Sequence, residues 1–132
     1  MASSGCQVAQ DAKDQFKALK ERKLESDYVV FKIEKEKEVI VDKIGGADET
    51  FEDFAKYLKN TGPRYAVYNV KKGNTDRLLL VSWISDNAKI KEKMVYSSTL
   101  NTLKSALNID CVMQCNDEDD LTEDAFQKAA FK

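Results

Sequence analysis

The chain has 132 residues, the size of one domain, and 42% of them are hydrophobic, enough to bury a core without disulfides or metal. Its 21 basic and 23 acidic residues give a net charge of −2, which argues against binding to nucleic acids or membranes through overall charge. Histidine is absent, so the most common general base and metal ligand is missing, and an enzyme or a metal protein is disfavoured.

The first half of the chain predicts a helix, a hairpin and a second helix, after a start at residues 1–6 that we expect to be flexible. Apolar residues at helical spacing predict the first helix over residues 8–19. Two β-branched and aromatic runs, 28–33 and 39–41, predict the hairpin, and Thr50 is the predicted N-cap of a short helix. The apolar positions of the first helix are Val8, Ala12, Phe16 and Leu19.

The second half predicts three strands and two helices. Strands at 64–70 and 78–84 flank a polar loop, and a third strand covers 109–115. A long helix covers residues 87–107, and Thr122 caps the last helix. Helices interleaved with hairpins predict an α/β (α+β) fold, in which helices cover both faces of a mixed sheet in a single domain spanning 1–132.

The hydrophobicity pattern of the sequence predicts neither a targeting signal nor a membrane span. The N-terminal residues lack the apolar core of a signal peptide, and the longest apolar run, 78–81, is far below the ~20 residues of a membrane helix. We therefore expect a soluble protein of the cytoplasm.

Neither cysteine nor acidic residues predict a cofactor or metal site. The three cysteines, Cys6, Cys111 and Cys115, are odd in number, and the last two would lie roughly 13 Å apart on a strand, too far for a disulfide. The acidic run 116–120 lacks the ligand spacing of a calcium loop. A glycine-rich phosphate loop and a nucleophile elbow are also absent, so we expect no catalysis and no cofactor.

The long helix, unrolled at about 100° per residue, separates into two faces. The predicted core face carries Val95, Tyr96, Leu100, Leu103, Ala106 and Leu107. The opposite face carries Ile90, Met94, Ser97, Ser98, Asn101 and Lys104, with Lys91 and Lys93 at its edges. Small polar residues around a methionine favour the approach of a partner. Two interpretations are open: a binding face, or an exposed face whose Met94 packs beneath a loop.

A motif within this region resembles the signature of the ADF/cofilin family. Residues 83–98, W-I-S-D-N-A-K-I-K-E-K-M-V-Y-S-S, are similar to the family pattern W-x-P-D-x-A-P-[IVL]-[KR]-x-K-M-x-Y-[AS]-S. Further matches are the strand 64–68, the dipeptide Ser4-Gly5 and the helix start 122–125. The resemblance covers nearly the whole chain in the expected order.

The resemblance implies a non-enzymatic protein with a sheet of five or six strands. It also implies binding to actin monomers and filaments and promotion of filament depolymerisation in the cytoplasm and cytoskeleton. Separately, a mass of 14.9 kDa is small enough for diffusion into the nucleus. The monomer-binding residues implied are Ser4, Gly5, Lys91, Lys93, Met94, Ser97, Ser98, Asn101 and Lys104. Phosphorylation of Ser4 and binding of phosphoinositide headgroups are further family properties, and an unmodified N-terminus is the alternative for Ser4.

The chain departs from the family pattern at several positions. Ser85 and Lys89 replace two prolines at the start of the long helix, which we expect to survive with a more mobile start. The filament-binding surface has few basic residues, because Thr75 replaces a basic residue and Lys128 and Ala129 stand where the family often carries an acidic–basic pair. Its remaining candidates are Arg77, Lys71, Lys72, Lys128 and Lys132. We therefore expect weak severing. A coactosin-like filament binder or a glia-maturation-factor-like branch regulator is the alternative.

Overall fold

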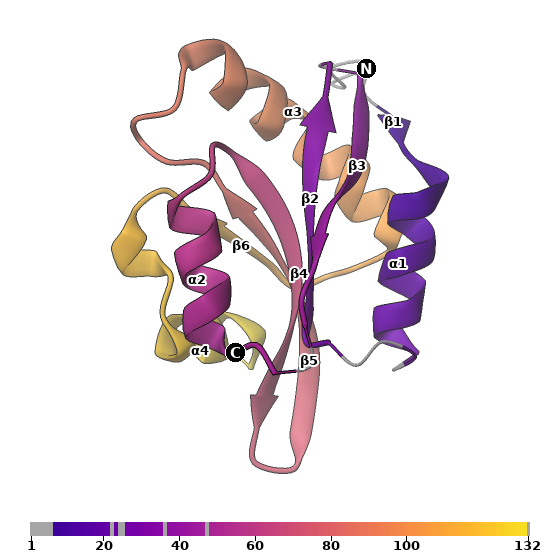
Figure 1. Cartoon of the computed structure of the whole chain (residues 1–132), viewed down its shortest axis with the longest axis vertical. Helices are drawn as coiled ribbons and strands as arrows, with labels where there is room; N and C mark the ends of the chain where they lie inside the picture. The colour runs from indigo at the N-terminus through magenta and orange to yellow at the C-terminus, as the bar shows by residue number, and fades with distance from the viewer. Residues whose placement is uncertain (1–6, 22, 24–25, 36, 47, 132) are drawn as a thin grey trace.

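The computed structural model describes residues 7–21, 23, 26–35, 37–46 and 48–131 (Figure 1). In chain order its elements are β1 (Gln7–Val8), α1 (Gln10–Lys20), β2 (Tyr28–Glu34), β3 (Glu38–Ile44), α2 (Phe51–Lys59), β4 (Arg64–Lys72), β5 (Thr75–Trp83), α3 (Ile90–Leu107), β6 (Val112–Cys115), the 3-10 turn η1 (Glu118–Asp120) and α4 (Glu123–Ala130).

The strands form one mixed sheet of six strands in the order β1-β3-β2-β4-β5-β6. The four central strands pair antiparallel, whereas β1 runs parallel to β3 and β6 runs parallel to β5 at the two edges. The hairpin predicted from two apolar runs is the β2–β3 pair. The mixed sheet predicted from the sequence is therefore confirmed, and its strand order places β4 near the centre.

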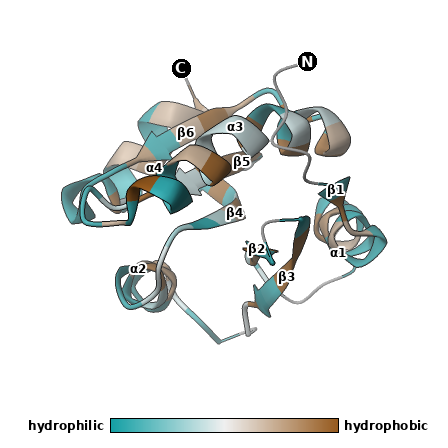
Figure 2. Ribbon diagram, turned by 90° about the horizontal axis from the view of Figure 1, so that it is seen from above, coloured by the Kyte–Doolittle hydropathy of each residue, from teal (hydrophilic) through white to brown (hydrophobic). Residues whose placement is uncertain are grey.

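Helices cover both faces of the sheet, as predicted. Figure 2 shows α2 and α1 on opposite sides of β2, β3 and β4. Alternate residues of β4 separate the two cores: Tyr65 and Val67 belong to the cluster with α1 and α3, whereas Ala66 and Val70 belong to the cluster with α2 and α4. This alternation follows from the two-residue period of a strand.

Two helices begin later than predicted. Val8 was assigned to the first helix, but it lies in β1 opposite Val39, so α1 begins at Gln10. The long helix is predicted from residue 87 but begins at Ile90, because the N–H groups of Asn87 and Ala88 form hydrogen bonds within a turn. In that turn they donate to the side chain and the carbonyl of Ser85, respectively. Such local hydrogen bonds compete with helix formation.

Two strand boundaries also differ from the prediction. The polar loop expected over 71–75 is a two-residue turn between longer strands, because Lys72 pairs with Thr75. Gly73 occupies the left-handed region at φ 60°, which glycine adopts without strain. The last strand was expected from Ile109, but it begins at Val112. Ile109 instead follows the left-handed C-cap Asn108 and is buried in the core beside α3.

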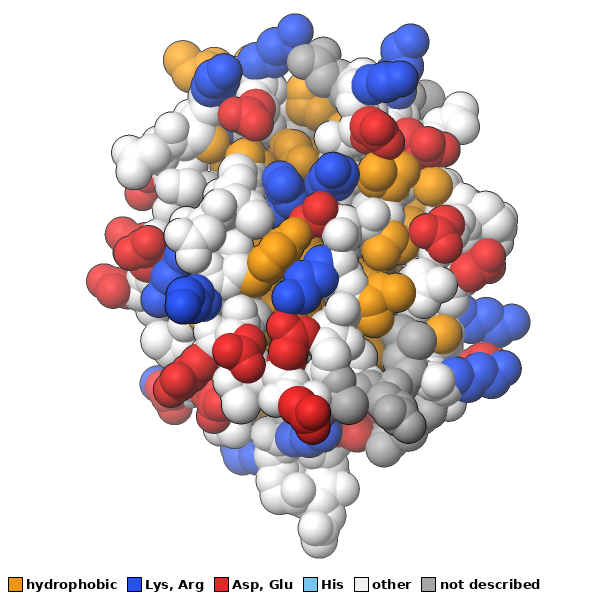
Figure 3. All heavy atoms as spheres, in the orientation of Figure 1, with side chains coloured by type: hydrophobic (Ala, Val, Ile, Leu, Met, Phe, Trp, Pro, Cys, Tyr) orange, Lys and Arg blue, Asp and Glu red, His pale blue; other side chains and the backbone are white. Residues whose placement is uncertain are grey.

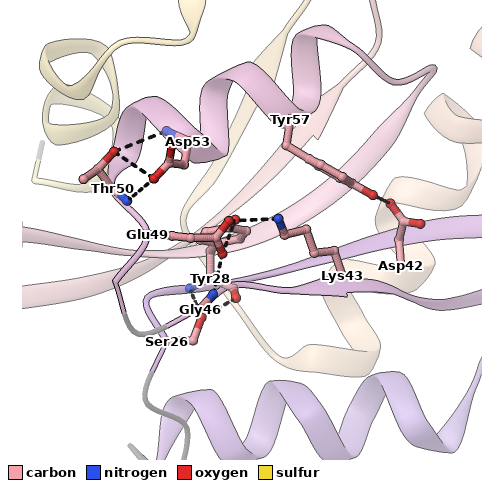
Figure 4. Close-up of polar contacts among 9 residues, drawn as sticks. All are labelled: Ser26, Tyr28, Asp42, Lys43, Gly46, Glu49, Thr50, Asp53 and Tyr57. Carbon is pink, nitrogen blue, oxygen red and sulfur yellow. Dashed lines mark hydrogen bonds and ion pairs between the residues drawn. The ribbon is translucent and has the colours of Figure 1, made fainter.

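The start of α2 is held by a polar network (Figure 4). Thr50 and Asp53 form a capping box, which confirms Thr50 as the N-cap. The carboxylate of Glu49 accepts hydrogen bonds from Lys43 Nζ (2.8 Å), from the Tyr28 hydroxyl (3.0 Å) and from the Gly46 N–H. These donors, Lys43 first, lower the pKa of Glu49 below its ordinary value. The network ties α2 to β2 and β3.

The C-terminal segment follows the predicted capping. Thr122 accepts from the Ala125 N–H at 3.1 Å, and the flanking residues Leu121 and Phe126 are both buried in one cluster. Cys115 is also buried there, and burial raises the pKa of its thiol to about 12. Within the described part of the chain, no group of three or more potential metal ligands is found and no helix can span a membrane.

Candidate functional site

The outer face of α3 is exposed along its whole length. Ile90 and Met94 expose 77% and 67% of their surface, which is unusual for large apolar residues. Ser97 and Asn101 are exposed beyond them, and Lys104 is exposed near the end of the helix. The alternative in which Met94 packs beneath a loop is therefore wrong. The face predicted by helical arithmetic is the one open to solvent.

The inner face of α3 differs from the prediction at its edge. Tyr96, Leu100, Leu103 and Leu107 are buried, as expected. Ala106 was assigned to the core but is exposed, and Val95 is only half-buried. Thr99 is fully buried instead, because it lies on the helix turn between Tyr96 and Leu103, where the sheet covers the helix.

Tyr96 fixes the rotation of α3 against the sheet. Its hydroxyl accepts a hydrogen bond from the Ile33 N–H of β2 at 3.0 Å, and its ring lies 5.1 Å from the ring of Tyr65 on β4. The Tyr65 hydroxyl donates to the Tyr96 carbonyl. Burial raises the pKa of Tyr96 above its ordinary value. These contacts hold the outer face of the helix in one orientation.

Lysines frame the exposed apolar pair at the start of α3. Lys89 and Lys91 are exposed, and Lys93 is half-buried. The ammonium of Lys93 donates to the Asp86 carbonyl at 2.7 Å, so this lysine already has an intramolecular contact. Figure 3 shows basic side chains projecting at the end of the molecule where α3 begins in Figure 1. A partner with an apolar groove edged by carboxylates would match this arrangement.

Ile90 belongs to this exposed face, although it is not among the residues predicted to bind actin monomers. It lies one turn before Met94 and is the most exposed of the large apolar residues described. The available signal was its position on the outer face of the predicted helix, opposite the core stripe. Ser98, which was predicted to bind actin monomers, is half-buried, and its hydroxyl donates to the Val95 carbonyl at 3.2 Å.

The N-terminal candidates Ser4 and Gly5 lie outside the described residues. The first described element, β1, contacts α3 as well as pairing with β3. The described chain therefore begins beside the helix that carries the exposed face.

A second group of predicted residues gathers at the opposite end of the molecule, around the β4–β5 turn (Figure 1). Arg77 donates from Nη1 to the Ala130 carbonyl at 3.3 Å, and its guanidinium carbon lies 5.5 Å from the Phe131 ring centre. Lys72 Nζ lies 6.0 Å from the same ring. Phe131 was not predicted as part of this surface, because its partners are distant in sequence.

The charges of this second surface are partly neutralised. Lys71 pairs with Asp27 at 3.1 Å, and Lys128 pairs with Asp124 at 3.1 Å within α4. Both pairs are largely exposed, so each is weak, but each occupies a lysine that was predicted to meet a partner. Lys132 lies outside the described residues.

Comparison with known proteins matches the chain to one family. The family described as cofilin/tropomyosin-type actin-binding protein matches residues 5–130. Actin-depolymerizing factor 1 of Petunia hybrida is 35% identical over 136 residues, which cover 98% of this chain and 97% of the relative. Actophorin of Acanthamoeba castellanii is 34% identical over 135 residues, with 98% and 97% coverage.

Solved structures agree with this match. The cofilin from Streptomyces griseoflavus superposes with a TM-score of 0.84 at 27% identity, over 96% of this chain and 100% of that one. Glia maturation factor of Caenorhabditis elegans (TM-score 0.76, 18% identity, 93% and 94% coverage) shares the fold alone. Human coactosin-like protein does so as well (0.75, 13%, 93% and 95%).

Proposed function

Because the chain belongs to the ADF/cofilin family, a family of actin-binding proteins that are not enzymes, we propose that it binds actin through the outer face of α3 and promotes filament depolymerisation. The observation that carries this proposal is the exposed pair Ile90 and Met94, framed by lysines, on a helix whose rotation is fixed by Tyr96. Exposed apolar residues of this size on a rigid helix are typical of a binding surface.

The apolar pair would supply much of the affinity. Full burial of an isoleucine or methionine side chain contributes about 1.5–3 kcal/mol, and both are mostly exposed in the free protein. Neither side chain is needed in the core, so their burial is available to a partner. An apolar groove on actin is the occupant that we propose.

The rest of the helix allows a close approach. Ser97 and Asn101 follow Met94 along the same face and present short side chains. Short side chains let the backbone of the helix approach an actin groove, and they can exchange hydrogen bonds with its rim. Lys91 and Lys104, at the two ends of this face, would pair with carboxylates of actin. Such ion pairs contribute more to the orientation and the association rate of a complex than to its affinity.

The same lysines can attract other anions. Lys89, Lys91 and Lys93 lie close together at the start of α3, and a phosphoinositide headgroup would compete there with actin. We place the protein in the cytoplasm with the actin cytoskeleton, and a chain of this size would also diffuse into the nucleus.

Filament side-binding and severing are proposed to be weaker than monomer binding. Lys71 and Lys128 are engaged by Asp27 and Asp124, and Arg77 by the end of α4. Single-filament microscopy beside a potent cofilin measures this directly. Severing at the rate of that cofilin would contradict the proposal.

Co-sedimentation with actin filaments, together with monomer binding measured by fluorescence, tests the surface on α3. The test variant is Lys91→Glu/Lys104→Glu, which reverses two charges and leaves Lys93 in place. The matched control is Lys56→Glu/Lys59→Glu, which makes the same change on the exposed side of α2. We expect the test variant to bind monomers much more weakly and to depolymerise less, because the new glutamates would repel carboxylates of actin, while the control keeps both activities. Thermal unfolding confirms that each variant is folded.

Equal losses in the two variants would show that net charge, not the α3 face, governs binding. A wild-type protein that pellets with filaments without moving actin to the supernatant would favour the coactosin-like alternative. Activity confined to branch junctions would favour a glia-maturation-factor-like role. The experiment is designed to distinguish these alternatives because, among the described residues, the second surface has few unpaired basic side chains. The main proposal is favoured because the chain is 35% identical to an actin-depolymerizing factor, but only 18% and 13% identical to glia maturation factor and coactosin-like protein.

A further inference from the structure

In the described chain, the backbone hydrogen bonds that join the connection between β5 and α3, residues 84–89, to the sheet lie in its first part. The Asp86 N–H donates to the Asn116 carbonyl at 3.1 Å, which continues the pairing of β5 with β6. Beyond this point the chain turns, and the Ala88 N–H donates to the Ser85 carbonyl at 2.9 Å. The last residues before α3 therefore leave the sheet and depend on other contacts.

The start of α3 lacks a local cap. Lys89 is the N-cap residue, and no side chain there accepts a hydrogen bond from the first turn. Serine, threonine or aspartate usually fills this position, and proline often follows it to preset the backbone. The helix thus begins without either device.

Lys93 supplies a contact in their place. Its ammonium lies 2.7 Å from the carbonyl oxygen of Asp86, whose N–H is held by Asn116 at the end of β6. Lys93 therefore links the first turn of α3 to Asp86, which is itself hydrogen-bonded to the chain after β6. The Asp86 residue is held on both sides, by β6 and by α3.

We propose that Lys93 is a positioning residue, which holds the connection 84–89 against α3 and so sets how Ile90 and Met94 are presented. Its effect on actin affinity rests on the function proposed above, whereas its effect on the connection does not. An ammonium has three N–H donors, so Lys93 can keep Asp86 and still meet a carboxylate of a partner. Its two roles are separable by experiment.

Three variants separate positioning from charge. Lys93→Met keeps an unbranched side chain of nearly the same length and a similar helix propensity but removes the donor. Lys104→Met removes the same charge at the far end of the same face. Lys89→Pro, added to each, fixes the backbone of the N-cap residue directly before the first turn, because Lys89 already has φ −65°, the value that the proline ring imposes.

The first readout is amide hydrogen exchange by NMR in the protein alone. We expect the N–H groups of Asp86, Ala88 and Lys93 to exchange roughly 3- to 10-fold faster in Lys93→Met, as loss of one hydrogen bond predicts, and to slow again when Lys89→Pro is added. Lys104→Met should leave them unchanged. Unchanged exchange in Lys93→Met, or no recovery with proline, would overturn the proposal.

The second readout is the dissociation constant for monomeric actin. We expect both methionine variants to bind more weakly, and Lys89→Pro to restore part of the loss in Lys93→Met but none in Lys104→Met. Equal recovery in the two backgrounds would overturn the positioning role in binding. If exchange responds as expected and even the wild type does not bind actin, the proposed function fails while the positioning of the connection by Lys93 stands.

Discussion

The hydroxyl of Tyr65, on the central strand β4, donates a hydrogen bond to the backbone carbonyl of Tyr96 in the middle of α3. The two rings also pack at 5.1 Å, and Tyr96 in turn accepts from the Ile33 N–H. The helix that carries the proposed actin-binding face is thus fixed to two strands of the sheet through one residue. Its outer face is presented by a rigid support.

Removal of the Tyr96 hydroxyl should destabilise the fold. Tyr96→Phe keeps the ring that packs on Tyr65 but leaves the Ile33 N–H without this acceptor, and an unsatisfied part-buried donor costs about 1–3 kcal/mol. Urea denaturation measures the loss. Ser97→Ala, on the exposed side of the same helix, is the control and should change stability by less than about 0.5 kcal/mol. A Tyr96→Phe protein as stable as the control would contradict this role.

Truncation of Met94 should weaken actin binding without affecting folding. Met94→Ala removes apolar surface that is exposed in the free protein, so its unfolding transition should not move, whereas its actin dissociation constant should rise about tenfold. Monomer binding followed by fluorescence checks this. Ile44→Ala truncates another exposed apolar residue, at the end of β3, and should bind normally. Equal effects of the two variants would argue against a specific site.

Glu49 should make stability depend on pH in the acid range. Its pKa is lowered in the folded state, chiefly by Lys43, so the folded carboxylate holds fewer protons than the unfolded one as pH falls. Its contribution is fully present above the ordinary value of 4.5 and is lost as pH falls through the lowered pKa. Glu49→Gln should be less stable by about 1 kcal/mol at pH 7 and flatter below pH 5 in urea unfolding series. Parallel pH profiles of the two proteins would refute this.

Release of the paired lysines on the second surface should strengthen filament binding. Two single variants, Asp124→Asn and Asp27→Asn, each remove the acidic partner of one lysine, Lys128 and Lys71 respectively. Because exposed pairs contribute less than about 1 kcal/mol, the gain in co-sedimentation affinity should be about two- to fivefold. Glu118→Gln makes the same change of charge on η1. If Glu118→Gln gives the same gain, the effect is one of net charge alone.

A negative charge at Ser4 should weaken actin binding. Phosphorylation would add about two negative charges, and Ser4→Glu imitates part of that change, which would repel a partner that offers carboxylates. We expect a several-fold rise in the actin dissociation constant for Ser4→Glu. Ser3→Glu is the matched control, because it adds the same charge one residue earlier. Binding by Ser4→Glu as tight as that of the wild type would remove this form of regulation.

Local patterns in the sequence were sufficient for most elements and for the exposed face of α3. Thr50 and Thr122 cap the helices predicted for them, and Met94 lies on the outer face as helical arithmetic required. Capping and helical periodicity act over a few residues, so they are readable without the fold. The identity of the family also followed from a local motif, the stretch 83–98, and the comparisons confirm it.

Tertiary structure decided the features that join distant segments. Val8, predicted in a helix, lies in a strand because it pairs with Val39. Lys93, predicted to bind a partner, also contacts Asp86 of the same chain. The grouping of Arg77 with Phe131 likewise depends on how α4 folds back on β5. Contacts of this kind depend on which surfaces the sheet order brings together, and no local periodicity encodes that order.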